Sequence, residues 1–222
     1  MRAKTKRQLA LVAGLTVWLV AVWLLWWSPV IYPLKLFVVL LHEASHGAMA
    51  LATGGEVLRI VVTPGQGGVC YCPGGNAFLT LSAGYLGSLG WGALILLAAR
   101  AKRPGPRNVT TVIGLAVLLL TALYVRNGFG ILFGSLFGAA LIALRSAGRT
   151  VHVLTLTALG LTSCLYALLD IKSDVLDRPY LESDARLLAE MTGVPTVVWG
   201  VLWIGLGIAV SVWLFRRALE RA

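Results

Sequence analysis

The stretch of residues 34–52 reads LKLFVVLLHEASHGAMALA and combines an apolar run with the pattern His-Glu-x-x-His at His42, Glu43 and His46. A run of about 20 residues is what a helix needs to cross a hydrocarbon core about 30 Å thick. A carboxylate inside such a run is costly unless it has a partner or a function. The stretch therefore predicts a membrane-embedded helix that carries a polar site.

The rest of the chain is built in the same way. It is 58% hydrophobic and only 13% charged, which is far from the balance of a soluble domain. Apolar runs bounded by Pro, Gly or basic clusters cover residues 9–27, 34–52, 76–99, 109–125, 129–144, 151–169 and 197–215. We therefore expect an all-α polytopic membrane protein with about six to seven membrane-embedded helices, forming a single domain over residues 1–222.

Residues 55–72 interrupt the helical pattern. β-formers such as Val57, Ile60 and Val69 flank a turn with the sequence PGQGG at residues 64–68. This pattern predicts a small β-hairpin directly after the His-Glu-x-x-His helix. Irregular backbone persists at membrane depth only where it packs on protein or lines a wet cavity.

Basic clusters mark the cytoplasmic side by the positive-inside rule. They lie at residues 100–107, 145–149 and 216–221, which places the C-terminus in the cytoplasm, whereas the acidic connection 170–190 belongs on the outer side. Three apolar runs precede the first cluster, although the basic N-terminus requires an even number of crossings. We expect residues 34–72 to enter from the outer side and return, with the hairpin as the re-entrant part.

The net charge of +10 is compatible with this topology. The basic residues flank apolar runs instead of following one helical face, which disfavours a nucleic-acid partner and favours a lipid bilayer. The pattern fits an integral protein of a bacterial inner membrane. The sequence does not indicate an oligomeric state.

The His-Glu-x-x-His pattern is typical of zinc hydrolases. His42 and His46 project from one helix face about one turn apart and can hold a single Zn²⁺, with Glu43 beside them to act on the attacking water. Neutral imidazoles preserve the Lewis acidity of the ion, and a carboxylate that is not a ligand can accept the proton. The alternative is a set of polar residues satisfied within a helix bundle. Two of only three histidines lie in this motif, which favours zinc.

A third zinc ligand is needed, and Asp170 is the best candidate because it ends an apolar run on another helix, where an unpaired charge is costly. Asp174, one turn later, is the second choice, since it lies nearer water. His152 lies near a predicted cytoplasmic boundary and is interpreted as a structural interfacial histidine. Asn127, in a turn on the predicted outer side, could donate a hydrogen bond to a substrate carbonyl or oxyanion, and a plain turn role is an equal alternative.

The chain resembles the site-2 protease family of intramembrane zinc metalloproteases, in its compact B-like branch. The resemblance covers about residues 34–176 and rests on the LHEASHG sequence at residues 41–47, the Gly-rich hairpin after it, and the Leu-Asp pair at Leu169 and Asp170 in a late helix. The second motif departs from the family pattern. Ile171 follows Asp170 where the family has Gly, and no Asn-x-x-Pro precedes it.

The resemblance implies that His42, His46 and Asp170 bind zinc and that Glu43 activates water for hydrolysis of peptide bonds in membrane proteins or peptides. A helical substrate must unwind first, because its carbonyls are otherwise occupied. The β-formers at residues 57–62 could pair with the extended segment by strand addition.

Two other functions compete with this one. A catalytically inactive protease-like protein would bind membrane partners, and a metal transporter would use the histidines to carry its cargo. The retained Glu43 argues against both. A transporter should also show a path of further intramembrane polar residues, and the other apolar runs carry almost none.

Overall fold

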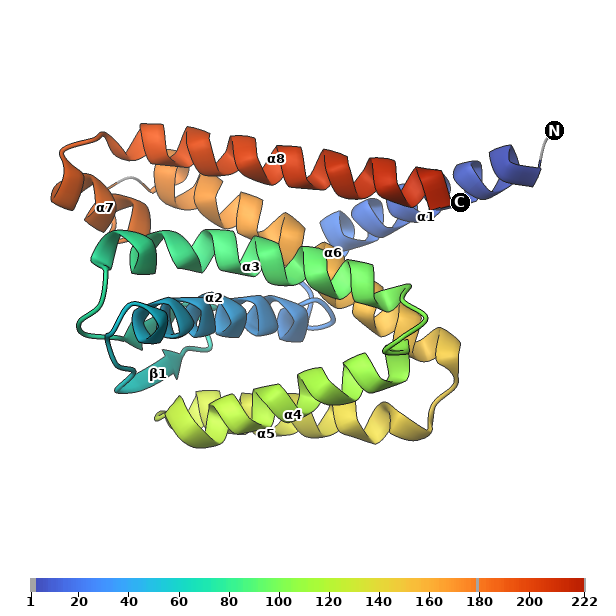
Figure 1. The fold of residues 1–222 in the computed structure, drawn as a ribbon, viewed down its shortest axis with the longest axis horizontal. Helices are drawn as coiled ribbons and strands as arrows, with labels where there is room; N and C mark the ends of the chain where they lie inside the picture. Colours follow the sequence, from blue (N-terminus) through green and yellow to red (C-terminus); the bar gives the residue numbers. More distant parts are fainter. Residues whose placement is uncertain (1–2, 179, 222) are drawn as a thin grey trace.

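The computed structural model describes residues 3–178 and 180–221 and is mainly helical (Figure 1). The helices are α1 (Ala3–Leu25), α2 (Tyr32–Ala52), α3 (Ala77–Ala99), α4 (Pro106–Tyr124), α5 (Gly128–Ala143), α6 (Arg149–Lys172), α7 (Asp184–Thr192) and α8 (Thr196–Arg221). A short 3-10 turn, η1 (Leu144–Ser146), follows α5, and a π turn, η2 (Ser173–Asp177), follows α6. Strands β1 (Arg59–Val62) and β2 (Gly68–Tyr71) lie between α2 and α3. The predicted fold class is confirmed.

Local sequence signals explain where several helices begin and end. Proline occupies the first turn of α2 and of α4, where its missing N–H costs nothing. The side chain of Asn76 caps α3 by accepting a hydrogen bond from the backbone N–H of Leu79 at 3.1 Å. Gly193 ends α7 in the left-handed conformation, with φ of 72°.

Among the described residues, six helices are long and apolar enough to cross a membrane: α2, α3, α4, α5 with η1, α6 with η2, and α8. In α1 the apolar stretch is shorter and covers only Val12–Leu25. Helix α2 has the length to cross by itself, and α1 has only this shorter apolar stretch. The re-entrant path expected for residues 34–72 stays a prediction.

The bundle has two ends of opposite charge (Figure 1). The basic end comprises the α3–α4 and α5–α6 connections and the end of α8, and it carries Arg107, Arg149 and Arg216. The hairpin, α7 and the end of α6 lie at the acidic end, where α6 carries Asp170 and η2 carries Asp174. This separation agrees with the positive-inside arrangement expected from the sequence.

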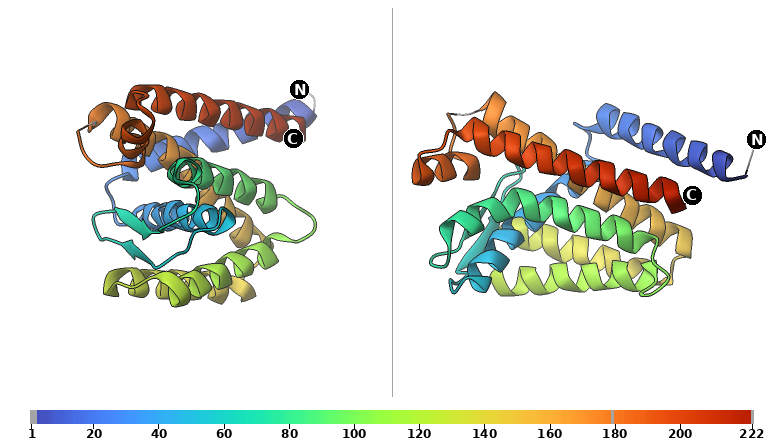
Figure 2. Two further views of the ribbon diagram at one scale, coloured as in Figure 1. Left: turned by 60° about the vertical axis from the view of Figure 1, so that its left-hand side comes forward. Right: turned by 45° about the horizontal axis from the view of Figure 1, so that its top comes forward.

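Helix α3 packs against both α2 and α6 (Figure 2). At its crossing with α6, a Cβ added to Gly92 would lie 3.0 Å from the carbonyl oxygen of Gly160, so only small residues allow this approach. Nearby, the Ser163 hydroxyl donates a hydrogen bond to the Ser88 carbonyl at 2.7 Å. These contacts fix α6 relative to the helix pair that carries the polar site.

The hairpin is packed on protein along one whole edge. β1 pairs antiparallel with β2, and its other edge meets the α4–α5 connection through a parallel bridge from Ile60 to Val125. The Arg126 N–H also donates to the Ile60 carbonyl at 3.1 Å. Strand addition at residues 57–62 is therefore wrong as a prediction, because both edges of β1 are already occupied.

Candidate metal centre

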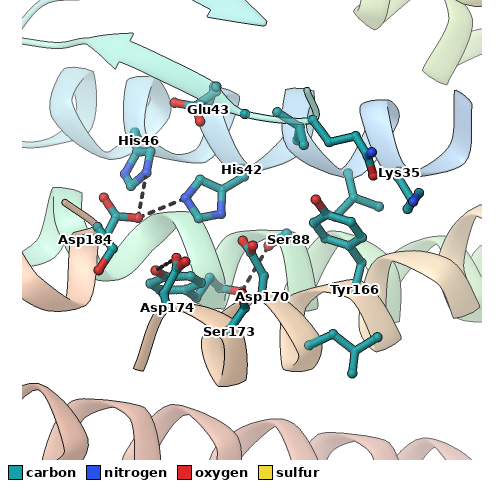
Figure 3. A pocket seen from close by; sticks show the side chains of 18 of the residues that line it. Lys35, His42, Glu43, His46, Ser88, Tyr166, Asp170, Ser173, Asp174 and Asp184 are labelled. Carbon is teal, nitrogen blue, oxygen red and sulfur yellow. Dashed lines mark hydrogen bonds and ion pairs between the residues drawn. The ribbon is translucent and has the colours of Figure 1, made fainter. Parts of the chain in front are cut away.

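Three side chains from two elements converge near the acidic end (Figure 3). On α2, His42 Nε2 and His46 Nε2 lie 2.9 and 3.1 Å from Oδ2 of Asp184, the first residue of α7. One possible ligand atom from each residue lies within 4.8 Å of the others. Helix α7 thus adds a carboxylate to the His-Glu-x-x-His motif.

Hydrogen bonding fixes the orientation of His46. Its Nδ1 lies 2.7 Å from the carbonyl oxygen of Thr80, which can only accept, so Nδ1 carries a proton. In a neutral imidazole, Nε2 is then a lone-pair donor that faces the Asp184 carboxylate oxygen. A contact of 3.1 Å between these two atoms requires either a proton on Nε2, which gives an imidazolium–carboxylate ion pair, or a metal ion bound to both. A histidine held through its other ring nitrogen is the usual arrangement of a metal ligand.

Asp184 is held in place by the docking of α7. Ser183 caps the helix by accepting a hydrogen bond from the Arg186 N–H at 3.3 Å, and Ala185 and Leu188 are fully buried. Burial alone would raise the pKa of the Asp184 carboxyl. The two imidazoles that face it outweigh this effect and hold its pKa below the usual range.

The three residues fit a zinc ion. Two histidines with one carboxylate are a donor set found in catalytic zinc sites, and such a set would leave a fourth position open. Gly84 of α3 allows both imidazoles to pack closely against that helix. A Cβ at this position would collide with Nε2 of both His42 and His46.

Glu43 is 5% exposed and belongs to none of these contacts. It lies against the start of β2, where a Cβ on Gly68 would collide with its carboxylate, and the Cys70 backbone N–H is within hydrogen-bonding reach of it. The carboxylate is therefore positioned beside the histidine pair and remains available for proton transfer.

The aspartates of α6 line the same cavity without joining the cluster (Figure 3). Asp170, the expected third ligand, lies outside the group whose atoms converge, and the carboxylate in that group is Asp184. Asp174 accepts hydrogen bonds from the Tyr85 hydroxyl at 2.6 Å and from Arg178 at 2.9 Å. Asp184 belongs to a segment outside the apolar runs that folds back over the motif.

Asn127 does not line the cavity. Its Nδ2 donates to the Val62 carbonyl at 2.7 Å, and its Oδ1 accepts from the Val62 N–H at 3.1 Å. Both polar groups of the amide are therefore used to hold β1. The structure shows this structural role, and the suggested contact with a substrate carbonyl or oxyanion stays a prediction.

The cavity has a volume of about 1720 Å³ and is lined by parts of α1, α2, the hairpin, α3, α6 and α7. This is larger than a typical small-ligand pocket of about 300–1,000 Å³. Its wall from α1 and the residues directly after it is apolar and includes Trp23 and Trp26. A chain segment fits these dimensions better than a small molecule.

Sequence reasoning missed Asp184, although a local signal was present. Ser183 precedes a short segment with buried positions at Ala185 and Leu188, which is the pattern of a capped amphipathic helix that must dock on something. What the pattern could not show is the surface on which this helix docks.

Comparison with known proteins agrees with the geometry. Residues 15–214 match the model of a family described as Peptidase M50B-like. This match bears out the resemblance to the site-2 proteases. No curated protein and no solved structure matches the chain.

Proposed function

We propose that this chain is a zinc metalloprotease that hydrolyses peptide bonds of membrane proteins within the bilayer. It belongs to the Peptidase M50B-like family and is an integral, multi-pass membrane protein. The observation that carries the proposal is the cluster of His42, His46 and Asp184 with Glu43 beside it.

His42, His46 and Asp184 would hold the zinc ion, with Asp184 in the role that the sequence assigned to Asp170. A zinc ion bound there supplies Lewis acidity for the attacking water and the scissile carbonyl. The hydrogen bond from His46 to Thr80 and the docking of α7 hold the ligands in position before the ion arrives.

Glu43 would act as the general base. It removes a proton from the water whose oxygen bonds to the carbonyl carbon, and it delivers that proton to the amine nitrogen as the C–N bond breaks. Its near-complete burial supports this role, because a desolvated carboxylate has few other proton donors than the reacting water.

The substrate would bind in extended form along β2. In an antiparallel ladder, pairs that bond to each other alternate with pairs whose backbone groups point away from the hairpin. The Thr63 N–H donates to the Gly67 carbonyl, so that pair is of the first kind. The pairs of the second kind are Val62 with Gly68 and Ile60 with Cys70. The outward backbone groups of β1 meet the α4–α5 connection. Those of β2 border the cavity near Glu43, so a substrate strand added at this edge would place its carbonyls beside the Glu43 carboxylate.

The charge pattern supports a bacterial inner membrane with the basic end and the C-terminus in the cytoplasm. The metal centre then lies toward the outer side. The partners are membrane-protein or peptide substrates and the surrounding lipid, not nucleic acid.

The decisive experiment compares the parent with Glu43→Gln in proteoliposomes. Both proteins receive a library of single-span membrane peptides, cleavage is read by mass spectrometry, and zinc is measured by elemental analysis. We expect about one zinc per chain in both proteins. Removal of the general base should lower cleavage by about 10²- to 10⁴-fold.

Glu56→Gln is the matched control, because Glu56 is exposed and lies outside the cavity. Its cleavage should equal that of the parent. Zinc binding without any cleavage by the parent would identify a non-catalytic protein. Equal cleavage by parent and Glu43→Gln would reject the assigned base.

A further inference from the structure

We propose that the basic end carries a phosphate-binding site, formed by the N-termini of α4 and α6 around the buried His152. The ligand is a phosphate group, either in the headgroup of an anionic phospholipid or as free phosphate. The proposal is independent of the protease activity, since the site lies at the opposite end of the bundle from the metal centre (Figure 1).

A cavity of about 320 Å³ lies where the two helices begin. It is lined by Gly105 and Arg107 at the start of α4 and by Arg149 and His152 in the first turn of α6. The N-cap residues Gly105 and Gly148 offer no side chain to the N–H groups of the first turns. Pro106 has no N–H, and the N–H groups of Asn108 and Val151 are bonded to the N-cap carbonyls. Two helices of 19 and 24 residues thus direct the positive ends of their dipoles toward one cavity.

His152 is the observation that calls for a ligand. Its side chain is 0% exposed, and neither ring nitrogen has a hydrogen-bond partner among the described residues. Buried polar atoms are nearly always paired, because an unpaired one costs about 1–3 kcal/mol. The imidazole lines the cavity, so a ligand in the cavity can accept a hydrogen bond from a ring N–H.

The charges around the cavity specify an anion. Arg107 and Arg149 line it, and no Asp or Glu does. The sequence contains no acidic residue between Glu56 and Asp170, so neither arginine has a nearby carboxylate along the chain. The described ion pairs involve other residues. A phosphate accepts hydrogen bonds from guanidinium groups, helix N–H groups and imidazole together.

The test uses delipidated protein in neutral detergent with two probes. Inorganic phosphate is titrated by calorimetry, and phosphatidylglycerol is compared by native mass spectrometry with diacylglycerol, which has no phosphate. The variant is Arg107→Gln combined with Arg149→Gln. Both side chains are exposed, so the fold should tolerate the change. Arg216→Gln, at the same end but outside the cavity, is the control with matched charge chemistry.

We expect the double variant to bind at least about tenfold more weakly, as loss of charge-assisted hydrogen bonds implies, and Arg216→Gln to stay within about twofold of the parent. Binding of phosphatidylglycerol alone would identify a lipid headgroup, and binding of inorganic phosphate alone a soluble ligand.

His152→Gln should also weaken binding. If this buried substitution unfolds the protein, the arginine variants still decide. The proposal is overturned if neither probe binds, or if Arg216→Gln weakens binding as much as the double variant, which would mean unspecific attraction to a basic surface.

Discussion

The two ends of the bundle bury their histidines in opposite ways. At the acidic end, His42 and His46 face a carboxylate, and His46 is also held by a backbone carbonyl. At the basic end, His152 has no partner among the described residues and lies with two arginines and two helix N-termini. The first setting is suited to a cation and the second to an anion. Burial of a histidine thus indicates a site only together with the charge of its neighbours.

The strongest way to break this contrast is to remove the carboxylate at the acidic end. Asp184→Ala should lose bound zinc, because one of three protein ligands disappears while both imidazoles remain. The loss of affinity should exceed the about 10- to 100-fold that an outer-shell partner is worth. Zinc per chain in detergent-purified protein is the measurement.

Asp170→Ala is the matched control, since Asp170 lines the same cavity but stays outside the cluster. It should keep its zinc. The reverse outcome, with zinc lost in Asp170→Ala and kept in Asp184→Ala, would return the third ligand to α6.

A second substitution displaces the two imidazoles. In Gly84→Ala, the new Cβ would collide with Nε2 of His42 and His46, so zinc affinity should fall by at least about tenfold as the imidazoles move. Gly90→Ala on the same helix is the control, because nothing lies within 4 Å of its added Cβ. Equal zinc affinity in the two variants would mean that the ion binds elsewhere.

Contacts between residues close in the sequence could be predicted at this site, whereas contacts between distant residues could not. The pairing of His42 and His46 is local and follows from helical periodicity, so it could be predicted with the helix that carries it. The contact of His42 with Asp184 spans 142 positions and depends on how α7 folds back. Periodicity describes the face of α7 but not the surface it covers.

The same limit applies to Asn127 and His152. The turn containing Asn127 was predictable, whereas its bonds to Val62 depend on the packing of the hairpin beside α4 and α5. His152 was correctly placed near the basic boundary. That a second helix N-terminus would meet it there depends on the packing of α4 against α6. Elements and charges follow from local pattern, while partners follow from tertiary structure.

A third substitution distinguishes the role of Glu43 in cleavage from the binding of zinc at the acidic end. In Gly68→Ala, the added Cβ would collide with the Glu43 carboxylate. Displacing a base by about 1 Å can cost about 10²-fold in rate, so cleavage should fall while zinc content stays at the parent level. Gly65→Ala in the same turn is the control, since its nearest neighbour would be 3.9 Å away. Loss of zinc in Gly68→Ala would show that Glu43 contributes to metal binding.

The smallest expected effect concerns an asparagine at each end. Asn127→Ala removes two hydrogen bonds to β1 and leaves the Val62 backbone groups without these partners, which should lower the free energy of unfolding by about 2 kcal/mol. Asn108→Ala, at the start of α4, is the control, because its side chain forms none of the described hydrogen bonds. Denaturant unfolding in detergent and phosphate-free buffer measures both. Equal stability of the two variants would mean that the hairpin is held by burial of Ile60 and Val62 alone. Packing, and not Asn127, would then fix the position of the free edge of β2.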